Sequence, residues 1–250
     1  MLVIRKIQHD LMETAQKKNY VFLMQAHLEE FFPVDCKVLG RPQIRRIIRV
    51  GMHRSGHHGF ETQGAVCRYL TLMFMLGSYF DIDPQTDWAG GILRRDEPAS
   101  VRMGRLYDRA MAYVQRIAGD DGQHYRRMMI RAYEMLDASL PKTGSGKLAA
   151  DAMAFGQRLY PQKHHAIGKN GWRRLLKSAS AAAPRHGCQG REGFILYAAL
   201  AFVLGVHFAR DPIFPWAATA LADSGGDAAV LQRDIRRALA SYLQATRTIS

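Results

Sequence analysis

The sequence predicts an all-α protein, and two observations lead to that prediction. Apolar residues recur at spacings of three and four along most of the chain, which is the period of a helix, and no stretch sustains the two-residue alternation of a strand. The composition is globular, with 48% hydrophobic residues among 250. That length is enough for one large domain or two small ones, and the composition excludes a disordered or collagen-like chain.

An internal repeat organises the chain at an offset of 128 residues. Eleven of the 25 positions from 69 to 93 are identical to their counterparts from 197 to 221, where chance would give about one or two. The positions that define the repeat are Tyr69, Gly77, Phe80, Asp83, Pro84 and Trp88 in the first copy and Tyr197, Gly205, Phe208, Asp211, Pro212 and Trp216 in the second. The alternative is that two buried helices merely look alike, but the Asp-Pro and Trp matches lie outside the apolar run.

We therefore expect a tandem duplication of one helical unit, packed as one pseudo-symmetric bundle. Sparser matches continue at the same offset without a gap, for example Arg109-Ala110 with Arg237-Ala238. The first unit covers residues 1–128, including the start of a connecting helix at about 121, and the second covers residues 129–250.

The expected helices follow from the spacing of apolar residues, and their ends follow from the positions of glycine and proline. Within the first unit the expected helices are, in order, residues 3–15, 20–32, 42–58, 62–80 and 99–117. The second of these must end near Pro33, because proline cannot continue a helix. Gly59 and its counterpart Gly187 stand where a helix C-cap needs a positive φ. Gly77 and Gly205 fall inside the central helices, which predicts a close helix crossing there.

The remaining segments are shorter or lie between the units. Asp-Pro at 83–84 and at 211–212 predicts a turn, because the residue before proline avoids the α region. Each Trp that follows is expected to fold onto the bundle as a short helix begins. A final helix is expected at 228–246, an extra helix at 121–138, and a linker at 141–147.

Neither a membrane span nor an export signal is evident. The most apolar segment, residues 194–208, has 15 residues, whereas a span needs about 20. The first ten residues carry charges and precede no apolar run of the kind that a secretory signal needs. Cys36, Cys67 and Cys188 lie far apart without a CxxC pair, which predicts buried free thiols. We expect a cytoplasmic protein.

Candidate chemical motifs are incomplete. The segment 143–147, TGSGK, lacks the first glycine and the final Ser or Thr of a phosphate-binding loop. His53 and His57 have the spacing of a shared metal site, but no Glu of an HExxH motif accompanies them. His164-His165, which precedes an expected loop at 168–171, has no nearby acidic ligand and is expected at the surface. No nucleophile motif is recognisable. We expect no catalytic residues, no cofactor, no metal and no enzymatic activity, although folding can assemble a triad from distant residues.

Basic residues are the better functional feature, since 35 Lys and Arg against 22 Asp and Glu give a net charge of +13. Helical basic faces recur at the same place in both copies; the candidate partner-binding residues are Arg45, Arg46, Arg49, Arg173, Arg174 and Lys177. An acidic protein surface is the partner that we expect. Nucleic acid is the competing partner, but no DNA-binding motif spacing is present. A merely solvated helix face is the other alternative.

The pattern of Tyr69, Gly77, Phe80, Asp83-Pro84 and Trp88-Ala89, with the residues matched to it in the second copy, resembles a group of helical bacterial proteins. These are accessory proteins encoded beside spike and effector-adaptor genes of type VI secretion systems. The first copy departs from the pattern at Asp87, where the second has Pro215. The resemblance implies a non-enzymatic, cytoplasmic co-chaperone or adaptor that helps an effector load onto the secretion spike. An immunity protein from such a cluster, or a nucleic-acid-binding bundle, would have the same composition.

Overall fold

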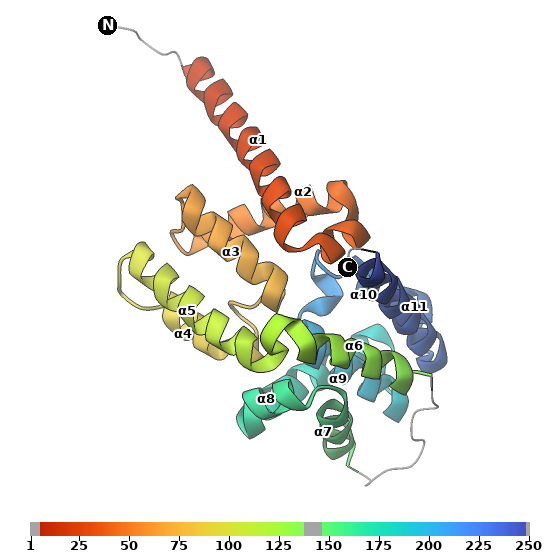
Figure 1. Ribbon diagram of the computed structural model, residues 1–250. Helices are drawn as coiled ribbons and strands as arrows, with labels where there is room; N and C mark the ends of the chain where they lie inside the picture. The colour runs from red at the N-terminus through yellow and green to blue at the C-terminus, as the bar shows by residue number, and fades with distance from the viewer. Residues whose placement is uncertain (1–5, 138–146, 249–250) are drawn as a thin grey trace, which may run out of the picture.

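The structure, a computed structural model, describes residues 6–137 and 147–248, and every regular element within them is helical (Figure 1). The predicted all-α class is confirmed. Eleven α-helices are present in these residues: α1 (Lys6–Phe31), α2 (Pro33–His57), α3 (Gln63–Leu76), α4 (Asp87–Leu93), α5 (Ala99–Ala118), α6 (Gln123–Met135), α7 (Leu148–Leu159), α8 (Pro161–Ala182), α9 (Arg191–Leu204), α10 (Pro215–Ser224) and α11 (Ala228–Arg247). Short 3-10 turns lie at Pro84–Thr86, Asp120–Gly122, Ala183–His186 and Phe208–Arg210.

The first two expected helices are one continuous helix, α1, so the predicted break between them is wrong. The intervening residues 16–19 contain neither glycine nor proline, and nothing in the local sequence ends a helix there. The end of α1 at Phe31 agrees with the predicted stop before Pro33. Figure 1 shows the N-terminal part of α1 extending away from the other helices.

Helices α2 and α8 begin with proline and bend at a glycine. Pro33 and Pro161 occupy the first turns, and each helix is interrupted seven residues later, by Gly40 (φ 73°) and Gly168 (φ 59°). The expected loop at 168–171, after His164-His165, therefore lies within α8, because proline fits the first turn of a helix and the glycine absorbs the kink. The predicted linker falls mainly on residues 138–146, which lie outside the described residues.

Gly77 and Gly205 end their helices rather than lying inside them, which corrects the predicted span of 62–80. Their backbones have φ values of 93° and 100°, a region that favours glycine. The predicted close approach does occur, because a Cβ on Gly77 would lie 3.1 Å from the Leu204 carbonyl oxygen. A Cβ on Gly205 would lie 2.8 Å from Oδ2 of Asp83. The two central helices, α3 and α9, thus meet at their C-terminal ends.

Several helix boundaries repeat at the predicted offset. Helices α3 and α9 differ by 128 residues at both ends, whereas α5 and α11 differ by 129. The gapless pairing of Arg109 with Arg237 is therefore shifted by one residue, because α11 begins seven residues after Leu221 whereas α5 begins six residues after the matched Leu93. Tyr113 and Tyr242 are the matched buried tyrosines. Duplication stays a prediction, and these coincidences support it.

The interior consists of two clusters of apolar side chains that cross the predicted boundary between residues 128 and 129. Tyr113 and Ile117 of α5 belong to the cluster formed mostly by the second half, and Ile213 belongs to that of the first half. The ends of the chain halves also interlock, because α5 packs on α8 and α11 packs on α2. Trp88 and Trp216 are half-buried against this interior. The halves therefore form one packed body.

No helix in the described part of the chain combines the length and apolar character needed to cross a membrane. The apolar segment at 194–208 overlaps α9, whose 14 residues run through the centre of the second half. Cys36 and Cys188 are buried free thiols, as predicted, whereas Cys67 is only half-buried.

Candidate binding groove

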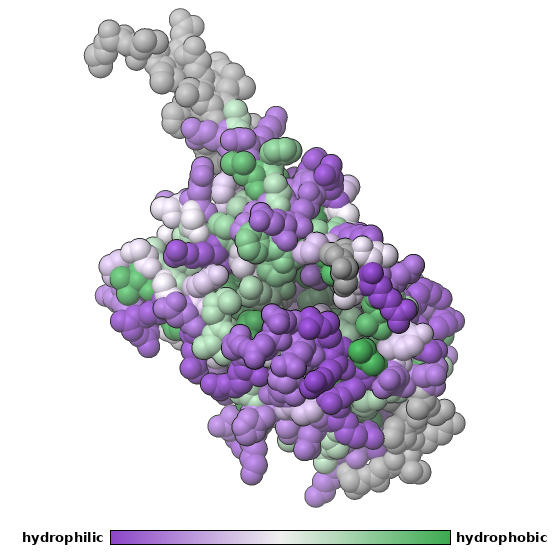
Figure 2. Space-filling model, in the orientation of Figure 1, coloured by the Kyte–Doolittle hydropathy of each residue, from purple (hydrophilic) through white to green (hydrophobic). Residues whose placement is uncertain are grey.

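An open groove of about 950 Å³ lies where the α1–α2 corner, α6 and α11 meet. In Figure 2 a hollow opens between the foot of α1 and α2 and the hydrophilic side chains over α6. The groove is mostly apolar and is lined by Phe31, Phe32, Pro33, Val34, Asp35, Tyr125, Arg126, Met129, Ile130, Tyr133, Glu134, Ala240, Tyr242, Leu243, Gln244, Thr246 and Arg247.

Large apolar side chains around this groove face solvent. Phe31 is 60% exposed, Ile130 48% and Tyr125 44%. A single exposed apolar residue is ordinary on a protein surface, but several around one concavity mark an interaction site. This concentration makes the groove the strongest candidate for binding.

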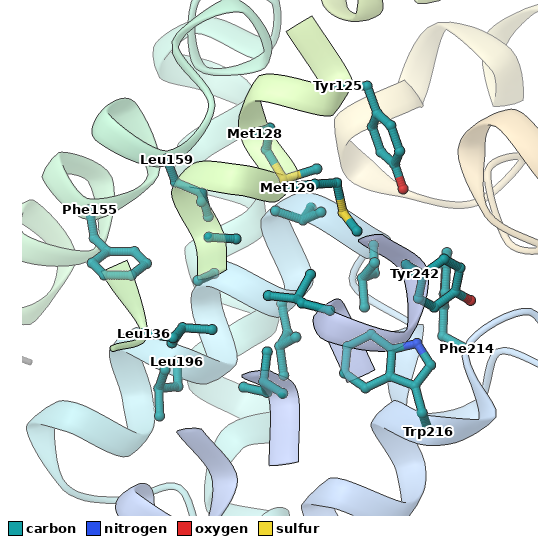
Figure 3. A pocket seen from close by; sticks show the side chains of 17 residues that line it. Tyr125, Met128, Met129, Leu136, Phe155, Leu159, Leu196, Phe214, Trp216 and Tyr242 are labelled. Carbon is teal, nitrogen blue, oxygen red and sulfur yellow. The ribbon is translucent and has the colours of Figure 1, made fainter. Parts of the chain in front are cut away.

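A second, smaller hollow lies directly beneath the groove and has a volume of about 70 Å³. It is walled by α6, α7, α9, α10 and α11, and nearly all of its surface is apolar. In Figure 3, Met128 and Met129 point inward from α6, Phe155 lies at one end of the cavity, and Trp216 and Tyr242 lie at the other. Tyr125, Met129 and Tyr242 line both hollows and form the neck between them.

Helix α6 separates the groove from the cavity because its sequence has two apolar faces. Met128, Met129 and Ala132 are buried on the inner side. Tyr125 lies at the edge between cavity and groove, while Ile130 faces the groove and solvent. A helix that is apolar on two sides must bury one and expose the other unless a partner covers it. Methionine side chains are flexible and fill irregular gaps, which suits the neck of a deformable site.

Two positions of the cavity wall differ in character from their matched positions in the first half. Leu196 and Ala199 line the cavity from α9, but the residues 128 positions earlier are Arg68, which is exposed, and Thr71, which is half-buried. Arg68 lies over the Tyr107 ring of α5, and the Thr71 hydroxyl donates to the Cys67 carbonyl oxygen of its own helix. The apolar walls around the groove and the cavity are thus not repeated at every matched position.

Charges are distributed unevenly along the groove. Tyr125 and Arg126 begin α6 near Arg247 at the end of α11, and the Lys37 ammonium donates to Thr248 Oγ1 over 2.7 Å at this same end. Glu134 lies toward the other end of α6. On the floor, burial raises the pKa of the Asp35 carboxyl to about 6. One end of the groove thus carries three exposed cations.

The six basic residues predicted from the sequence are all exposed, and none of them lines the groove. Arg45 donates to Gln25 Oε1 over 2.8 Å. Arg174 is bound within the chain, since its guanidinium lies 2.7 Å from Asp87 and also donates to the Pro84 carbonyl oxygen. Asp87 is the departure from the repeat pattern, so this ion pair, which joins the two halves, has no counterpart at the matched positions Arg46 and Pro215. Among the described residues the other four make no ion pair; they are Arg46, Arg49, Arg173 and Lys177.

A buried polar cluster surrounds Asp81 away from the groove. Its carboxylate accepts hydrogen bonds from Tyr69 Oη and His58 Nε2, each at 2.9 Å, and forms an ion pair with Arg54. Burial alone would raise the pKa of Asp81, but these bonds outweigh it and hold the pKa below its usual value. Each donor is tied to the same carboxylate, so the cluster pins the turn after α3 to α2.

No group of three potential metal ligands occurs in the described ranges 6–137 and 147–248. His53 and His57 lie edge to face with ring centroids 4.4 Å apart. The groove itself was not found from the sequence, because its walls come from three distant segments. The available signal was the apolar outer side of the helix predicted at 121–138, where Tyr125 and Ile130 stand among arginines.

The fold and the site together define an all-helical protein with an open apolar groove above a smaller apolar cavity. Comparisons of the chain with protein-family models, with curated proteins and with solved structures find no match.

Proposed function

We propose that this chain is a non-enzymatic protein-binding scaffold and that the groove between the α1–α2 corner, α6 and α11 holds its partner. The observation that carries the proposal is the exposure of Phe31, Tyr125 and Ile130 around one concavity. Covering this surface removes apolar area from water, which contributes about 25 cal/mol per Å².

The chemistry of the lining favours binding over catalysis. The groove residues include one buried carboxylate, Asp35, and no histidine, cysteine or serine. Acyl or phosphoryl transfer by a side-chain nucleophile needs that nucleophile beside a base, and no hydrogen-bonded pair of this kind is present among the described groove residues. Aromatic residues, methionine and arginine are, by contrast, the residues enriched at protein interfaces.

The resemblance of the Tyr, Gly, Asp-Pro and Trp pattern to type VI accessory proteins suggests which proteins the groove binds. Accessory proteins of type VI secretion clusters work beside effectors and adaptors, so we propose a cytoplasmic co-chaperone that holds an effector or its adaptor. The repeat-defining residues would then maintain the fold, since Asp83 and Asp211 are buried and bound to backbone N–H groups. The exposed Arg46, Arg49, Arg173 and Lys177 remain available as a secondary acidic-partner surface.

The test is capture of a partner from a bacterial lysate by the wild type and by two variants. Ile130→Glu places a charge in the groove, and Ile82→Glu is the matched control, because Ile82 is an isoleucine with 53% exposure that does not line the groove. We expect a protein captured by the wild type and by Ile82→Glu but lost with Ile130→Glu. Circular dichroism and the melting temperature check that both variants fold.

Two results would contradict the proposal. Capture that survives Ile130→Glu unchanged would exclude the groove as the binding surface. Recovery of nucleic acid instead of protein at physiological salt, with an affinity that falls steeply as salt rises, would favour the nucleic-acid alternative.

A further inference from the structure

The described walls of the groove are helical, and this limits what can bind there. The main-chain groups of α1, α2, α6 and α11 bond within their own helices, so the groove offers an incoming chain no strand edge to pair with. A bound segment must satisfy its own backbone N–H and C=O groups, which a helix does. The free volume of about 950 Å³ accommodates one face of a short helix.

The charges at the two ends of the groove determine which end of a bound helix should be acidic. Arg126 and Arg247 lie at one end of the groove together with Lys37, and Tyr133 and Glu134 lie toward the other end. Tyr133 also lies under the Arg236 guanidinium, 4.5 Å from the ring centroid, so α6 and α11 run in opposite directions along the groove. Acidic side chains of a ligand are therefore favoured at the end formed by the start of α6 and the end of α11.

We propose that the groove receives an amphipathic helix of a protein partner, with acidic residues placed against Arg126, Arg247 and Lys37. This rests on the proposed function and specifies the recognised chemistry. The apolar face of the helix covers Phe31 and Ile130 and reaches the neck formed by Tyr125, Met129 and Tyr242. One apolar anchor at the neck extends toward the inner cavity, whose flexible Met128 and Met129 side chains can give way.

A small apolar molecule is a poorer match to the site. The smaller cavity holds about 70 Å³, whereas pockets for drug-sized ligands span about 300–1,000 Å³ and enclose most of the ligand. The larger hollow is an open groove that would leave such a molecule in contact with water. A helix covers the open side with its own polar face.

Fluorescence anisotropy with labelled synthetic peptides tests the inference. The acidic probe is a 14-residue amphipathic peptide with Leu at helical i, i+3, i+4 and i+7 positions and Glu at one end. A second peptide carries Lys in place of each Glu, and a third has the acidic composition in scrambled order. We expect the acidic probe to bind at least about tenfold more tightly than either comparison peptide, a difference of about 1.4 kcal/mol.

Charge reversal in the protein should change which peptide binds better, and an unfolded variant would not show such a change of preference. The double variant Arg126→Glu with Arg247→Glu should weaken the acidic probe about tenfold or more and strengthen the Lys peptide. The matched control is Arg105→Glu with Arg109→Glu, the same charge change on an exposed face of α5 outside the groove. It should leave the affinity of the acidic probe within about twofold, because charges beyond about 10 Å are screened at physiological salt.

The outcomes separate this inference from the proposed function. Equal binding of the acidic and scrambled peptides, or an unchanged preference in the groove double variant, overturns the helix inference. If lysate capture is still lost with Ile130→Glu in that case, the groove binds a partner of another shape and the proposed function stands. Displacement of the acidic probe by laurate at micromolar concentration would instead assign the site to an acyl chain and overturn the inference.

Discussion

Asp83 and Asp211 each stabilise the opposite half of the chain. Oδ2 of Asp83 accepts the N–H of Val206 at 2.7 Å, and Oδ2 of Asp211 accepts the N–H of Ser78 at 2.8 Å. Val206 and Ser78 are themselves 128 residues apart, so the two bonds are counterparts. Each carboxylate also accepts an N–H from its own turn. The Asp-Pro turns therefore act as a reciprocal clasp between the halves.

Removing either carboxylate should destabilise the whole body. Asp83→Ala or Asp211→Ala leaves two backbone N–H groups without an acceptor, and we expect a loss of about 2–4 kcal/mol in the free energy of unfolding. Asp87→Ala is the control, because Asp87 is exposed and its ion pair with Arg174 contributes about 1 kcal/mol or less. Urea denaturation measures all three, and equal losses would contradict a clasp.

A side chain at the helix crossing should also be costly. Gly205→Ala places a Cβ at φ 100° and 2.8 Å from Asp83 Oδ2, so we expect a loss of about 2–3 kcal/mol from backbone strain and contact. Gly104→Ala is the opposite case, because Gly104 lies inside α5 with no atom within 4 Å of the added Cβ. It should stabilise by about 0.5–1 kcal/mol through helix propensity. A destabilising Gly104→Ala would contradict this comparison, which thermal unfolding measures.

The three tryptophans should differ in their contribution to stability. Trp172 is 1% exposed and stacks on Phe202 with ring centroids 4.6 Å apart. We expect Trp172→Ala to cost about 3–5 kcal/mol, as large core truncations do. Trp88 and Trp216 are only half-buried, so Ala at either should cost less, about 2–3 kcal/mol. Chemical denaturation gives the order, and a Trp88→Ala loss larger than that of Trp172→Ala would contradict it.

Asp35 should make stability depend on pH. Burial raises its pKa from 3.8 to about 6, and the groups facing it include Tyr125 of α6 and Tyr242 of α11. A raised pKa means that the protonated form is favoured on folding, so its contribution is full below pH 3.8 and is lost as pH rises through about 6.

Replacing Asp35 by Asn should therefore stabilise the folded protein at neutral pH. We expect Asp35→Asn to raise the free energy of unfolding by about 1–3 kcal/mol at pH 7.5, because the buried charge is removed. At pH 4 the variant and the wild type should be nearly equal. Denaturation curves at both pH values check this, and a gain that is the same at pH 4 would exclude titration of Asp35 as its cause.

The sequence predicts those features of the structure that depend on residues close together in the chain. The helices at 99–117 and 228–246 were placed within a residue or so of α5 and α11, because amphipathic periodicity and flanking turns are local. Gly59 and Gly187 have the expected positive φ. The break assigned within α1 was wrong because polar residues 16–19 do not oppose a helix. Gly77 was placed inside a helix because periodicity continues past it, although its backbone ends the helix.

The candidate site was much less accessible to sequence reasoning. The basic residues were expected to carry binding, yet Arg174 is held by Asp87 within the chain, and the groove lies elsewhere. Phe31, Tyr125 and Tyr242 are about a hundred residues apart in the chain and meet only after folding. No local sequence pattern indicates that these three residues line the same groove.

The sequence by itself therefore determined the helical class, the ends of α5 and α11 and the two Asp-Pro turns, because these depend on neighbouring residues. The offset of 128 is read directly from the sequence. Only the tertiary structure shows that each Asp-Pro carboxylate accepts a backbone N–H of the opposite half, and that the inner side of α6 covers a cavity. It also shows that the outer side of α6 faces an open groove. The physical reason is that burial is settled by contacts between segments distant in sequence, which local propensity does not encode.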